Sequence, residues 1–491
     1  MIINIFAVCK LLGPTLNALA VVALIPTLYA LVSHTVGASV FFMMATIAFV
    51  VGHILSFIGK HGSHNQSQIQ MVLTIRELFL FTTCMWVLIA FISAIPIYML
   101  LPDVDYTGAL FETASGLSTT GATVINHLDT RPPALLLWRS ILQLLGGIGF
   151  VVIAVAVLPQ VAMGGMNIFK TESTYFENSS KFTPHMKTMS IAILGWYLGS
   201  LVLCTLAYII GDLDPFMAIN AAMCTVATGG MMPVDASMNG MSPFVHYSAS
   251  FFMFISSCPF TVLIAGLSGN FHKLISDQQV RGYFIFTLLV ALAVTATLFF
   301  RNNYDLERAF RISLFNVVSI LSSSGFNLED FTMWNPLATL IFLVILPIGG
   351  CAGSTSGGMK FFRLQVCASL FRTQLVKSIH PHRVISPQFN GHPLDVATIN
   401  SIITYIAAYF IVALVSSFVA TALGLNITDA ITATITCLSN IGPALGPELN
   451  PSSNFAGLSS GLYVLFSLDM LLGRLEIIPV ILCLTRMFWR N

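Results

Sequence analysis

Charged side chains are scarce in this sequence. Only 8% of its 491 residues are Asp, Glu, Lys or Arg, and 56% are hydrophobic, whereas a typical soluble domain is about 25% charged. So little charge cannot cover a water-facing surface. The mean hydropathy of +0.86 and recurring apolar runs of about 20 residues, the length that crosses a bilayer, instead predict an all-α polytopic membrane protein.

The sequence also lacks the patterns of metal sites, disulfide frameworks and intramembrane enzymes. Its nine cysteines are scattered through apolar segments with no CxxC pair, which favours packing residues over a disulfide or metal set. The apolar runs contain no HExxH motif or paired aspartates, so we expect neither an enzyme nor an organic cofactor. The formal net charge of +1 indicates no nucleic-acid partner.

Ten long apolar stretches are candidate membrane spans. The stretch after Lys10 carries no small-residue cleavage site, so we expect a retained helix rather than a signal peptide. The last and the third-last stretches are longer than one crossing requires. The candidates lie near 16–33, 38–59, 78–101, 133–161, 188–211, 243–268, 283–300, 336–371, 397–423 and 457–488.

Four shorter segments alternate with these spans and are too short to cross a bilayer. They lie at 107–131, 214–241, 306–333 and 427–452. Each combines a helix-like stretch with a glycine-containing turn. The sequences are FETASGLSTTGAT at 111–123, NAAMCTVATGGMM at 220–232, NVVSILSSSGFNL at 316–328 and TATITCLSNIGPA at 432–444, and the aligned glycines are Gly121, Gly229, Gly325 and Gly442.

The chain therefore repeats one membrane-pore-membrane unit four times. We expect the four repeats in a pseudo-fourfold arrangement around a central pore, together with an N-terminal two-helix hairpin. The predicted boundaries are 1–65 for the hairpin and 66–170, 171–275, 276–390 and 391–491 for the repeats.

Lys and Arg concentrate in alternate connections, at 60–76, 170–187, 272–281 and 360–383, and at the C-terminal end. The positive-inside rule makes these faces cytoplasmic, with both termini on the same side. The short segments then enter from the outer face, beneath a partly acidic vestibule that attracts cations. Its predicted acids are Asp103, Asp105, Asp129, Asp212, Asp214, Asp305, Glu329, Asp330 and Glu448.

Four interrupted segments in one chain indicate a shared cavity, because an unpaired peptide group in hydrocarbon costs several kcal/mol. Short helices aimed at that cavity present their negative C-terminal ends, and the carbonyls after them become cation ligands. Glycine permits the positive φ that such a turn requires. Hydroxyl groups adjoin these glycines at Thr119, Thr120, Thr123, Thr228, Ser323 and Ser324. The pattern predicts a cation filter.

Two other features have more than one interpretation. Glu112, inside the first short helix, is either a cation site or a first-turn acid that satisfies backbone donors, and we favour the structural role. The run GGCAGSTSGGMK at 349–360 is either a flexible break that obstructs the pore or a close-packing seam of small residues. The sequence favours neither interpretation of the second feature.

Ionisable residues also occur in the last apolar stretch, where SLDMLLGRLEIIP at 467–479 contains Asp469, Arg474 and Glu476. Such groups are costly at membrane depth and usually face a pathway or a partner. Arg474 either pairs with Glu476 or lies on the pore axis as a positive barrier. We favour the barrier, because residues two apart point to different faces of a helix.

At these residues the sequence resembles the Trk/Ktr/HKT superfamily of potassium transporters, and most closely its bacterial TrkH-type subunits. The resemblance rests on the four loops, GGCAGSTSGGMK, the LLGRLE run and the two leading helices. It implies that potassium is the substrate and that Arg474 is a barrier below the filter. The implied filter residues are Thr119, Thr120, Gly121, Ala122, Thr123, Ala227, Thr228, Gly229, Ser323, Ser324, Gly325, Asn440, Ile441 and Gly442. The implied gating loop is 349–358, with Gly349, Gly350, Gly353, Ser354, Thr355, Gly357 and Gly358.

The resemblance further implies a homodimer in the bacterial cytoplasmic (inner) membrane. A cytoplasmic ring of nucleotide-binding regulatory subunits, similar to TrkA and of the NAD or ATP type, would contact the basic faces at 170–187 and 360–393. The turns depart from the TVGYG of tetrameric potassium channels, so we expect a looser preference for potassium over sodium, while Gly121 is typical of potassium-preferring members.

We therefore expect potassium uptake through a four-loop filter, gated by the intramembrane loop and a regulatory subunit. The alternative is a proton- or sodium-coupled potassium symporter with alternating access. Two inverted halves would indicate such a transporter, and four repeats in one direction argue against it.

Overall fold

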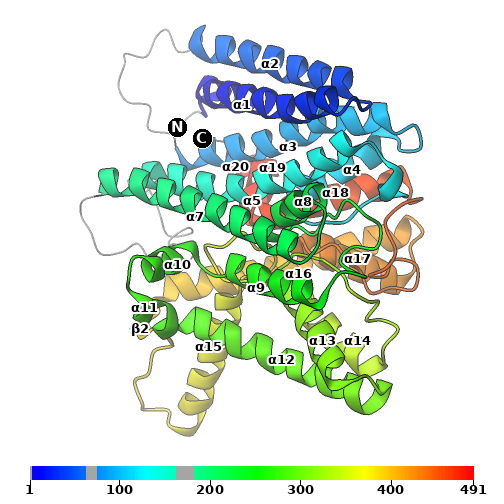
Figure 1. Cartoon of the computed structure of the whole chain (residues 1–491). Helices are drawn as coiled ribbons and strands as arrows, with labels where there is room; N and C mark the ends of the chain where they lie inside the picture. The colour runs from blue at the N-terminus through cyan, green and yellow to red at the C-terminus, as the bar shows by residue number, and fades with distance from the viewer. Residues whose placement is uncertain (1–2, 62–73, 162–181, 491) are drawn as a thin grey trace.

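The computed structural model describes residues 3–61, 74–161 and 182–490, and it is helical over most of that length (Figure 1). The predicted all-α class is confirmed, with the addition of one small antiparallel hairpin, β1 (Gln388–Phe389) and β2 (His392–Pro393). The helices of the described part are α1 (Ile5–Val32), α2 (Ala38–His61), α3 (Ile75–Leu100), α4 (Tyr106–Leu117), η1 (Leu128–Thr130), α5 (Pro133–Val161), α7 (Phe182–Ile210), α8 (Pro215–Val226), α9 (Pro243–Ser256), α10 (Phe260–Leu267), α11 (Phe271–Ser276), α12 (Gln278–Asn302), α13 (Leu306–Leu321), α14 (Pro336–Ile345), α15 (Phe361–Ile379), α16 (Val396–Ala422), α17 (Ile427–Ser439), α18 (Ser460–Arg474), α19 (Ile478–Leu484) and α20 (Arg486–Trp489).

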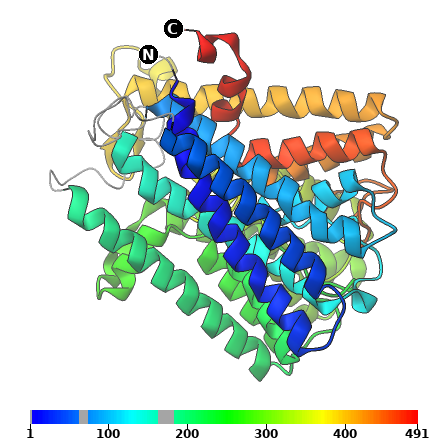
Figure 2. The same cartoon turned by 90° about the horizontal axis from the view of Figure 1, so that it is seen from above.

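Four helix trios reproduce the membrane-pore-membrane unit. In each trio a long helix is followed by a short one and then by a third helix. The trios are α3-α4-α5, α7-α8-α9, α12-α13-α14 and α16-α17-α18. Helices α1 and α2 form the additional leading hairpin and pack against α3 at the edge of the bundle (Figures 1 and 2).

The trios are arranged in a ring. The third helix of the first trio, α5, packs against the short helix α8 of the second, and α9 packs against α13 in the same way. Helix α18 of the last trio packs against α4 of the first. The last repeat therefore lies beside the first, as the predicted pseudo-fourfold arrangement requires.

Three stretches that the sequence predicts as single spans are broken in the structure. Between α9 and α10 the chain bends by 105°, the predicted span at 336–371 divides into α14 and α15, and that at 457–488 divides after α18. A proline stands at the first two breaks, Pro259 and Pro347, and Pro479 lies in the first turn of α19, just after the third. Proline lacks the N–H that would continue a helix, so it ends the regular hydrogen bonding there.

The described part contains six helices that are long and apolar enough to cross a membrane, or seven if the bent pair of α9 and α10 is one span. The first helix begins at Ile5, earlier than the predicted residue 16. Lys10 did not prevent this, since its side chain is exposed at the helix surface. The chain is a multi-pass membrane protein.

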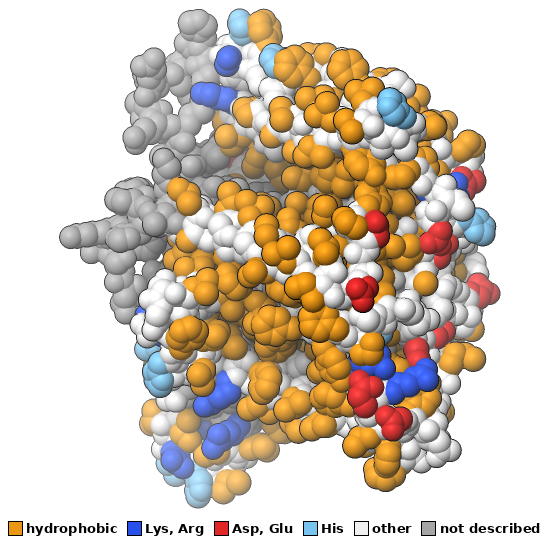
Figure 3. All heavy atoms as spheres, viewed as in Figure 1, with side chains coloured by type: hydrophobic (Ala, Val, Ile, Leu, Met, Phe, Trp, Pro, Cys, Tyr) orange, Lys and Arg blue, Asp and Glu red, His pale blue; other side chains and the backbone are white. Residues whose placement is uncertain are grey.

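Charged side chains lie at opposite faces of an apolar bundle. In Figure 3 most Asp and Glu side chains gather toward the right of the view, and hydrophobic side chains cover the middle. Both ends of the described chain share one face, because the backbone N–H of Asn4 donates to Glu77 and Arg76 donates to the carbonyl of Phe488. In the basic connection predicted at 170–187, Lys170 and Lys181 lie outside the described residues, as do the predicted boundaries near 65 and 170.

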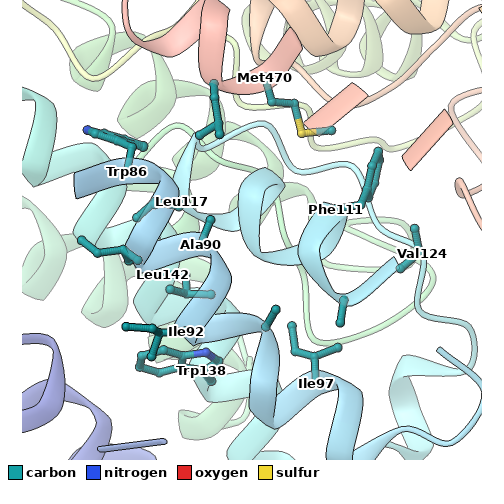
Figure 4. Packing of buried hydrophobic residues seen from close by; sticks show 14 of the residues in the cluster. Trp86, Ala90, Ile92, Ile97, Phe111, Leu117, Val124, Trp138, Leu142 and Met470 are labelled. Carbon is teal, nitrogen blue, oxygen red and sulfur yellow. The ribbon is translucent and has the colours of Figure 1, made fainter. Parts of the chain in front are cut away.

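The first short helix is held in an extensive hydrophobic cluster. Phe111 and Leu117 of α4 belong to the same cluster as Trp138 of α5 and Met470 of α18 (Figure 4). Phe111 and Trp138 are fully buried. Because protein interiors are close-packed, these contacts fix the position of α4 and of the turn that follows it.

Candidate ion pathway

Each of the four short helices begins at a side-chain cap, an oxygen that accepts hydrogen bonds from the first backbone N–H groups. The caps are Asp105, Asp214, Asp305 and Asn426. The fourth helix is capped by Asn426 rather than by the nearby Thr428 or Asp429. With their beginnings fixed, all four helices direct their negative C-terminal ends at the turns that follow.

The backbone of the four turns follows one pattern. A residue with positive φ comes first, and a glycine with positive φ follows two positions later. Positive φ strains most side chains, so the pattern is unusual at even one position. The first residues are Thr119 (57°), Thr228 (52°), Ser323 (56°) and Asn440 (55°), and the glycines are Gly121 (88°), Gly230 (74°), Gly325 (78°) and Gly442 (103°).

The second turn corrects the sequence alignment by one residue. The prediction pairs Gly229 with Gly121, but the glycine with positive φ is Gly230. Two adjacent glycines can each occupy such a position, so the sequence does not distinguish them. Gly229 instead corresponds to Thr120, and Ala227 ends helix α8 before the turn begins.

The four turns form a closed ring of backbone contacts. A Cβ built on Gly121 would collide with the carbonyl oxygen of Gly229 in the next repeat. The same relation joins Gly230 to Ser324, Gly325 to Ile441, and Gly442 to Thr120. Each glycine therefore lets its turn approach a carbonyl of the next repeat, and the fourth contact returns to the first repeat.

A side chain of each of the first three short helices holds the carbonyl that follows the glycine. Ser115 Oγ donates to the carbonyl of Ala122 (2.6 Å), and Ser319 Oγ donates to that of Phe326 (2.7 Å). Cys224 Sγ makes the equivalent contact with Met231 (2.9 Å). These carbonyls face their own helices. Ala122, a predicted filter residue, therefore directs its carbonyl away from the ring.

The helices also hold a backbone N–H further along each turn. Glu112 accepts from Val124 (2.8 Å), Asn316 from Leu328 (3.3 Å), and Thr432 from Leu445 (3.2 Å). The equivalent position in the second repeat is Pro233, which has no N–H to satisfy. None of the four described copies therefore leaves an unpaired backbone N–H at this position. Three copies supply a side-chain acceptor, and the second has a proline, which lacks the donor.

Glu112 has the structural role that we favoured. It is fully buried and pairs with Arg139 Nε at 2.7 Å, and it also accepts from Thr123 Oγ1 (3.0 Å). It lies in the second turn of α4 rather than the first. Its charge is neutralised by a buried guanidinium, so Glu112 stabilises the first turn of the pathway instead of binding a cation.

Two residues of α5 that sequence reasoning missed hold the neighbouring turn. Arg139 Nη1 donates to the carbonyl of Met232 (3.0 Å). Gln143 donates to the carbonyl of Gly229 and accepts from the N–H of Met231. Polar residues four apart on an apolar helix share one face, and that spacing is the signal that could have identified them.

One cavity of about 360 Å³ lies above the ring. All four positive-φ glycines line it, together with segments that follow the turns. The described cavity wall includes an acid, Asp235, but none of the nine acids predicted for the vestibule lines it. Asp103 is paired with Arg131, whose guanidinium holds the pKa of Asp103 below its ordinary value, and Asp105 caps α4.

The 346–360 loop, which connects α14 to α15 and includes the predicted gating loop, lies directly against the first residues of three turns. Thr228 Oγ1 donates to Thr355 Oγ1 (3.2 Å), and the N–H of Gly357 donates to Ser323 Oγ (2.5 Å). The backbone of Gly357 also packs against Asn440, where an added Cβ would come within 2.7 Å of the Asn440 Cβ. The loop is thus packed under the ring, on the side away from the 360 Å³ cavity.

Hydrogen bonds to α10 and within the loop fix other residues of the 346–360 loop. The Gly353 carbonyl accepts from the N–H of Phe260 (3.0 Å), and Ser354 Oγ donates to the Cys351 carbonyl (2.6 Å). Close contacts are built into the loop as well, because a Cβ on Gly349 would collide with the carbonyl of Gly357. The small residues therefore serve as a packing seam at the same place where the loop covers the ring.

Arg474 fastens the loop from below. Its Nη1 donates to the carbonyl of Thr355 (2.7 Å), and its Nη2 donates to the carbonyl of Gly146 (2.9 Å) in α5. The side chain is buried. The carboxylate of Glu476 binds Arg363 Nη2 at 2.7 Å.

Two basic residues of the predicted cytoplasmic contact face are buried. Lys360 Nζ donates to the carbonyl of Ser356 (2.5 Å), and Arg363 stacks over the ring of Tyr405 at 3.5 Å. Both stabilise the end of the 346–360 loop and the start of α15. The exposed basic residues of that face are Arg372, Lys377 and Arg383.

The available ligands around the ring are neutral oxygens. Thr119 Oγ1 and Asn440 Oδ1 are buried and have no hydrogen-bond partner among the described residues, while the Asn440 amide donates to Thr120 Oγ1 (3.1 Å) and joins the fourth turn to the first. In the same described part, no group of three or more His, Cys, Asp or Glu could hold a metal ion. Carbonyl, hydroxyl and amide oxygens suit a weakly held monovalent cation.

A bundle of membrane helices that encloses four inward-directed pore-helix turns around one cavity defines a cation transport protein of the pore-loop class. The chain belongs to the TrkH family, described as cation transport proteins, because the family model matches residues 39–490. It is accordingly a transporter and not an enzyme.

Individual relatives agree with this assignment. The chain is 35% identical to the Trk system potassium uptake protein TrkI of Halomonas elongata, over 84% of each chain, and 31% identical to TrkH of Vibrio parahaemolyticus, over 99% of each. The crystal structure of the potassium transporter TrkH from Vibrio parahaemolyticus superposes with a TM-score of 0.88 at 29% identity, covering 99% of this chain and 100% of that one.

Proposed function

We propose that this protein takes up potassium across the bacterial cytoplasmic membrane through the ring of four turns. The closed ring Gly121–Gly229, Gly230–Ser324, Gly325–Ile441 and Gly442–Thr120 carries the proposal. It brings four equivalent backbone segments to one axis under a single cavity, which is the geometry needed to replace the water around an ion. The potassium uptake named for the relatives supports the choice of ion.

The filter in this proposal comprises the predicted residues of the four turns, extended by Gly230. Carbonyls at the position of Thr120 lie at the contacts between repeats, and the buried oxygens of Thr119 and Asn440 lie at the first position of their turns. Because the four copies differ in sequence, the oxygens are not equivalent by symmetry. That supports a looser selectivity than in a symmetric tetramer.

The 346–360 loop is the proposed gate. Arg474 holds it in place by a hydrogen bond and also serves as a positive barrier. The loop contacts the turns through Thr355 and Gly357, and Arg474 holds the Thr355 carbonyl. A conducting pathway requires the loop to leave this position. Moving the loop away must break the two hydrogen bonds of Arg474 or displace α18. Binding of a regulatory subunit would provide the free energy for this movement.

For partners, we propose a homodimer on a TrkA-like cytoplasmic ring of nucleotide-binding subunits. The contact face would be the exposed basic part of α15 and the following segment, with Arg372, Lys377 and Arg383, while the 170–187 connection lies largely outside the described residues. In this arrangement the basic face and both termini are cytoplasmic, and the membrane is the inner membrane. The repeat boundaries remain as predicted from the sequence.

A proton- or sodium-coupled potassium symporter remains the second candidate. It would require the site to open alternately to each side, whereas the ring is closed by contacts between all four repeats. Flux into vesicles that contain the purified protein distinguishes the two. We expect potassium flux driven by its own gradient alone, and flux that depends on an imposed sodium or proton gradient would favour the symporter.

A further inference from the structure

The outer cavity has one acidic side chain whose role is not explained by the filter. Asp235 follows the second turn and lines the cavity with the four glycines. Its carboxylate is exposed and accepts hydrogen bonds from the backbone N–H of Leu128 (3.1 and 3.2 Å). Among the described residues that line this cavity, Asp235 is the only Asp or Glu.

Three other acids of this face are paired with arginines. Asp103 pairs with Arg131, Glu329 with Arg308, and Glu307 with Arg311. The cavity also contains one arginine, Arg139, but it is paired with the buried Glu112. The negative charge of Asp235 is therefore not cancelled by a neighbouring arginine within the described cavity wall.

A second observation points to a ligand at the same place. Asn327 follows the third turn, lines the same cavity and is 9% exposed. Its Nδ2 donates to the carbonyl of Pro451 (2.9 Å), which fixes the amide plane. Its Oδ1 has no hydrogen-bond partner among the described residues, although a buried amide oxygen normally has one.

We propose that Asp235 and Asn327 form an outer capture site for a monovalent cation, above the filter. Resting on the proposed potassium uptake, the site deepens it by naming where the ion first binds. A single carboxylate beside a neutral amide oxygen favours a monovalent cation, because the several carboxylates that would retain a divalent one are absent from the described cavity wall. A negative group in a concave wall also raises the local cation concentration.

The test compares reconstituted wild-type protein with Asp235→Asn and, as a matched control, Asp212→Asn, which removes an exposed carboxylate that does not line the cavity. Potassium uptake is measured against external potassium at low ionic strength and again with added choline chloride. For Asp235→Asn we expect the half-saturating potassium concentration to rise roughly threefold to tenfold at low ionic strength, with an unchanged maximal rate. Salt should shrink the difference, because it screens exposed charges.

Asp235→Glu and Asp212→Asn should both behave as the wild type. Equal half-saturation for wild type and Asp235→Asn, or an equal shift in Asp212→Asn, would overturn the capture site. Asn327→Leu should also raise the half-saturating concentration, and an unchanged value would overturn the part assigned to Asn327. A wild type that takes up no potassium contradicts the proposed function itself, a result distinct from equal half-saturation in proteins that all transport.

Discussion

The Cα of Gly121 faces the carbonyl oxygen of Gly229 so closely that a Cβ would collide with it. The same relation recurs in order around all four repeats and returns to Thr120. Glycine is required here for two reasons, the approach of the neighbouring carbonyl and the φ of +88°. The four turns therefore position one another, and a change at one glycine should affect its neighbour.

Alanine substitutions in the second repeat test which of its two adjacent glycines belongs to this ring. Gly230→Ala places a Cβ at φ +74° against the backbone carbonyl of Ser324, whereas Gly229→Ala meets only the end of the Gln143 side chain and has no positive φ. Left-handed backbone costs an alanine about 1–2 kcal/mol. We expect Gly230→Ala to reduce potassium flux about tenfold and Gly229→Ala to reduce it much less. Equal losses in the flux assay would reject the assignment of Gly230.

Substitutions of Arg474 test whether its hydrogen bonds hold the 346–360 loop in place. Arg474→Ala removes two buried hydrogen bonds, to Thr355 and Gly146, and each hydrogen bond from a charged group contributes about 1.5–3 kcal/mol. We expect potassium flux without any regulatory subunit to rise on the order of tenfold. Arg474→Lys keeps the charge and should stay closer to wild type. Unchanged flux in Arg474→Ala would leave the residue a purely structural role.

The pair of Glu112 and Arg139 is expected to matter for stability. Both side chains are at most 2% exposed, and removing one partner of a buried pair costs about 3–5 kcal/mol. Arg139→Met should therefore lower the thermal unfolding temperature strongly. Arg131→Met is the matched control, since its pair with Asp103 lies at the surface, with the Asp103 side chain 48% exposed, and such pairs contribute about 0–1 kcal/mol. Similar unfolding temperatures for the two variants would contradict the role of the buried pair.

Asp103 should make a small contribution that depends on pH. Arg131 lowers its pKa in the folded protein, so the stabilisation is present above the unfolded pKa and is lost as the pH falls through the folded pKa. Between about pH 5 and pH 3, around the ordinary aspartate pKa, unfolding temperature should fall slightly more for wild type than for Asp103→Asn. Identical slopes for wild type and Asp103→Asn would count against the pair.

The repeat pattern was predictable because the structure of each copy restricts which residues can occur at defined positions of the sequence. A short helix needs an end, a turn with positive φ favours glycine, and a half-span is too short to cross lipid. Four such signals in order predicted the ring. Gly229 was taken for Gly230 because the two glycines are adjacent, and Gln143 was missed because its four-residue spacing from Arg139 is a weaker signal than a repeated glycine turn.

The path of the last helices was less predictable for a different reason. Hydropathy measures length and apolarity, and a broken segment such as 336–371 is as apolar as a continuous one. The prolines at the breaks were visible, but α1 contains Pro14 and Pro26 and continues. Whether a proline ends a helix depends on tertiary contacts such as those of Thr355 and Arg474, which lie far apart in sequence.

The most direct test of the central claim compares the ion preference of Gly121→Ser with that of Gly240→Ser. Gly240 has a similar φ of +82° but nothing within 4 Å of an added Cβ, so it controls for backbone strain alone. Potassium and sodium fluxes are measured in the same vesicles. The account predicts that Gly121→Ser lowers the preference for potassium over sodium about tenfold, as expected from about 1–2 kcal/mol of local strain at the filter, while Gly240→Ser retains it. An unchanged preference in Gly121→Ser would contradict a filter built on this ring.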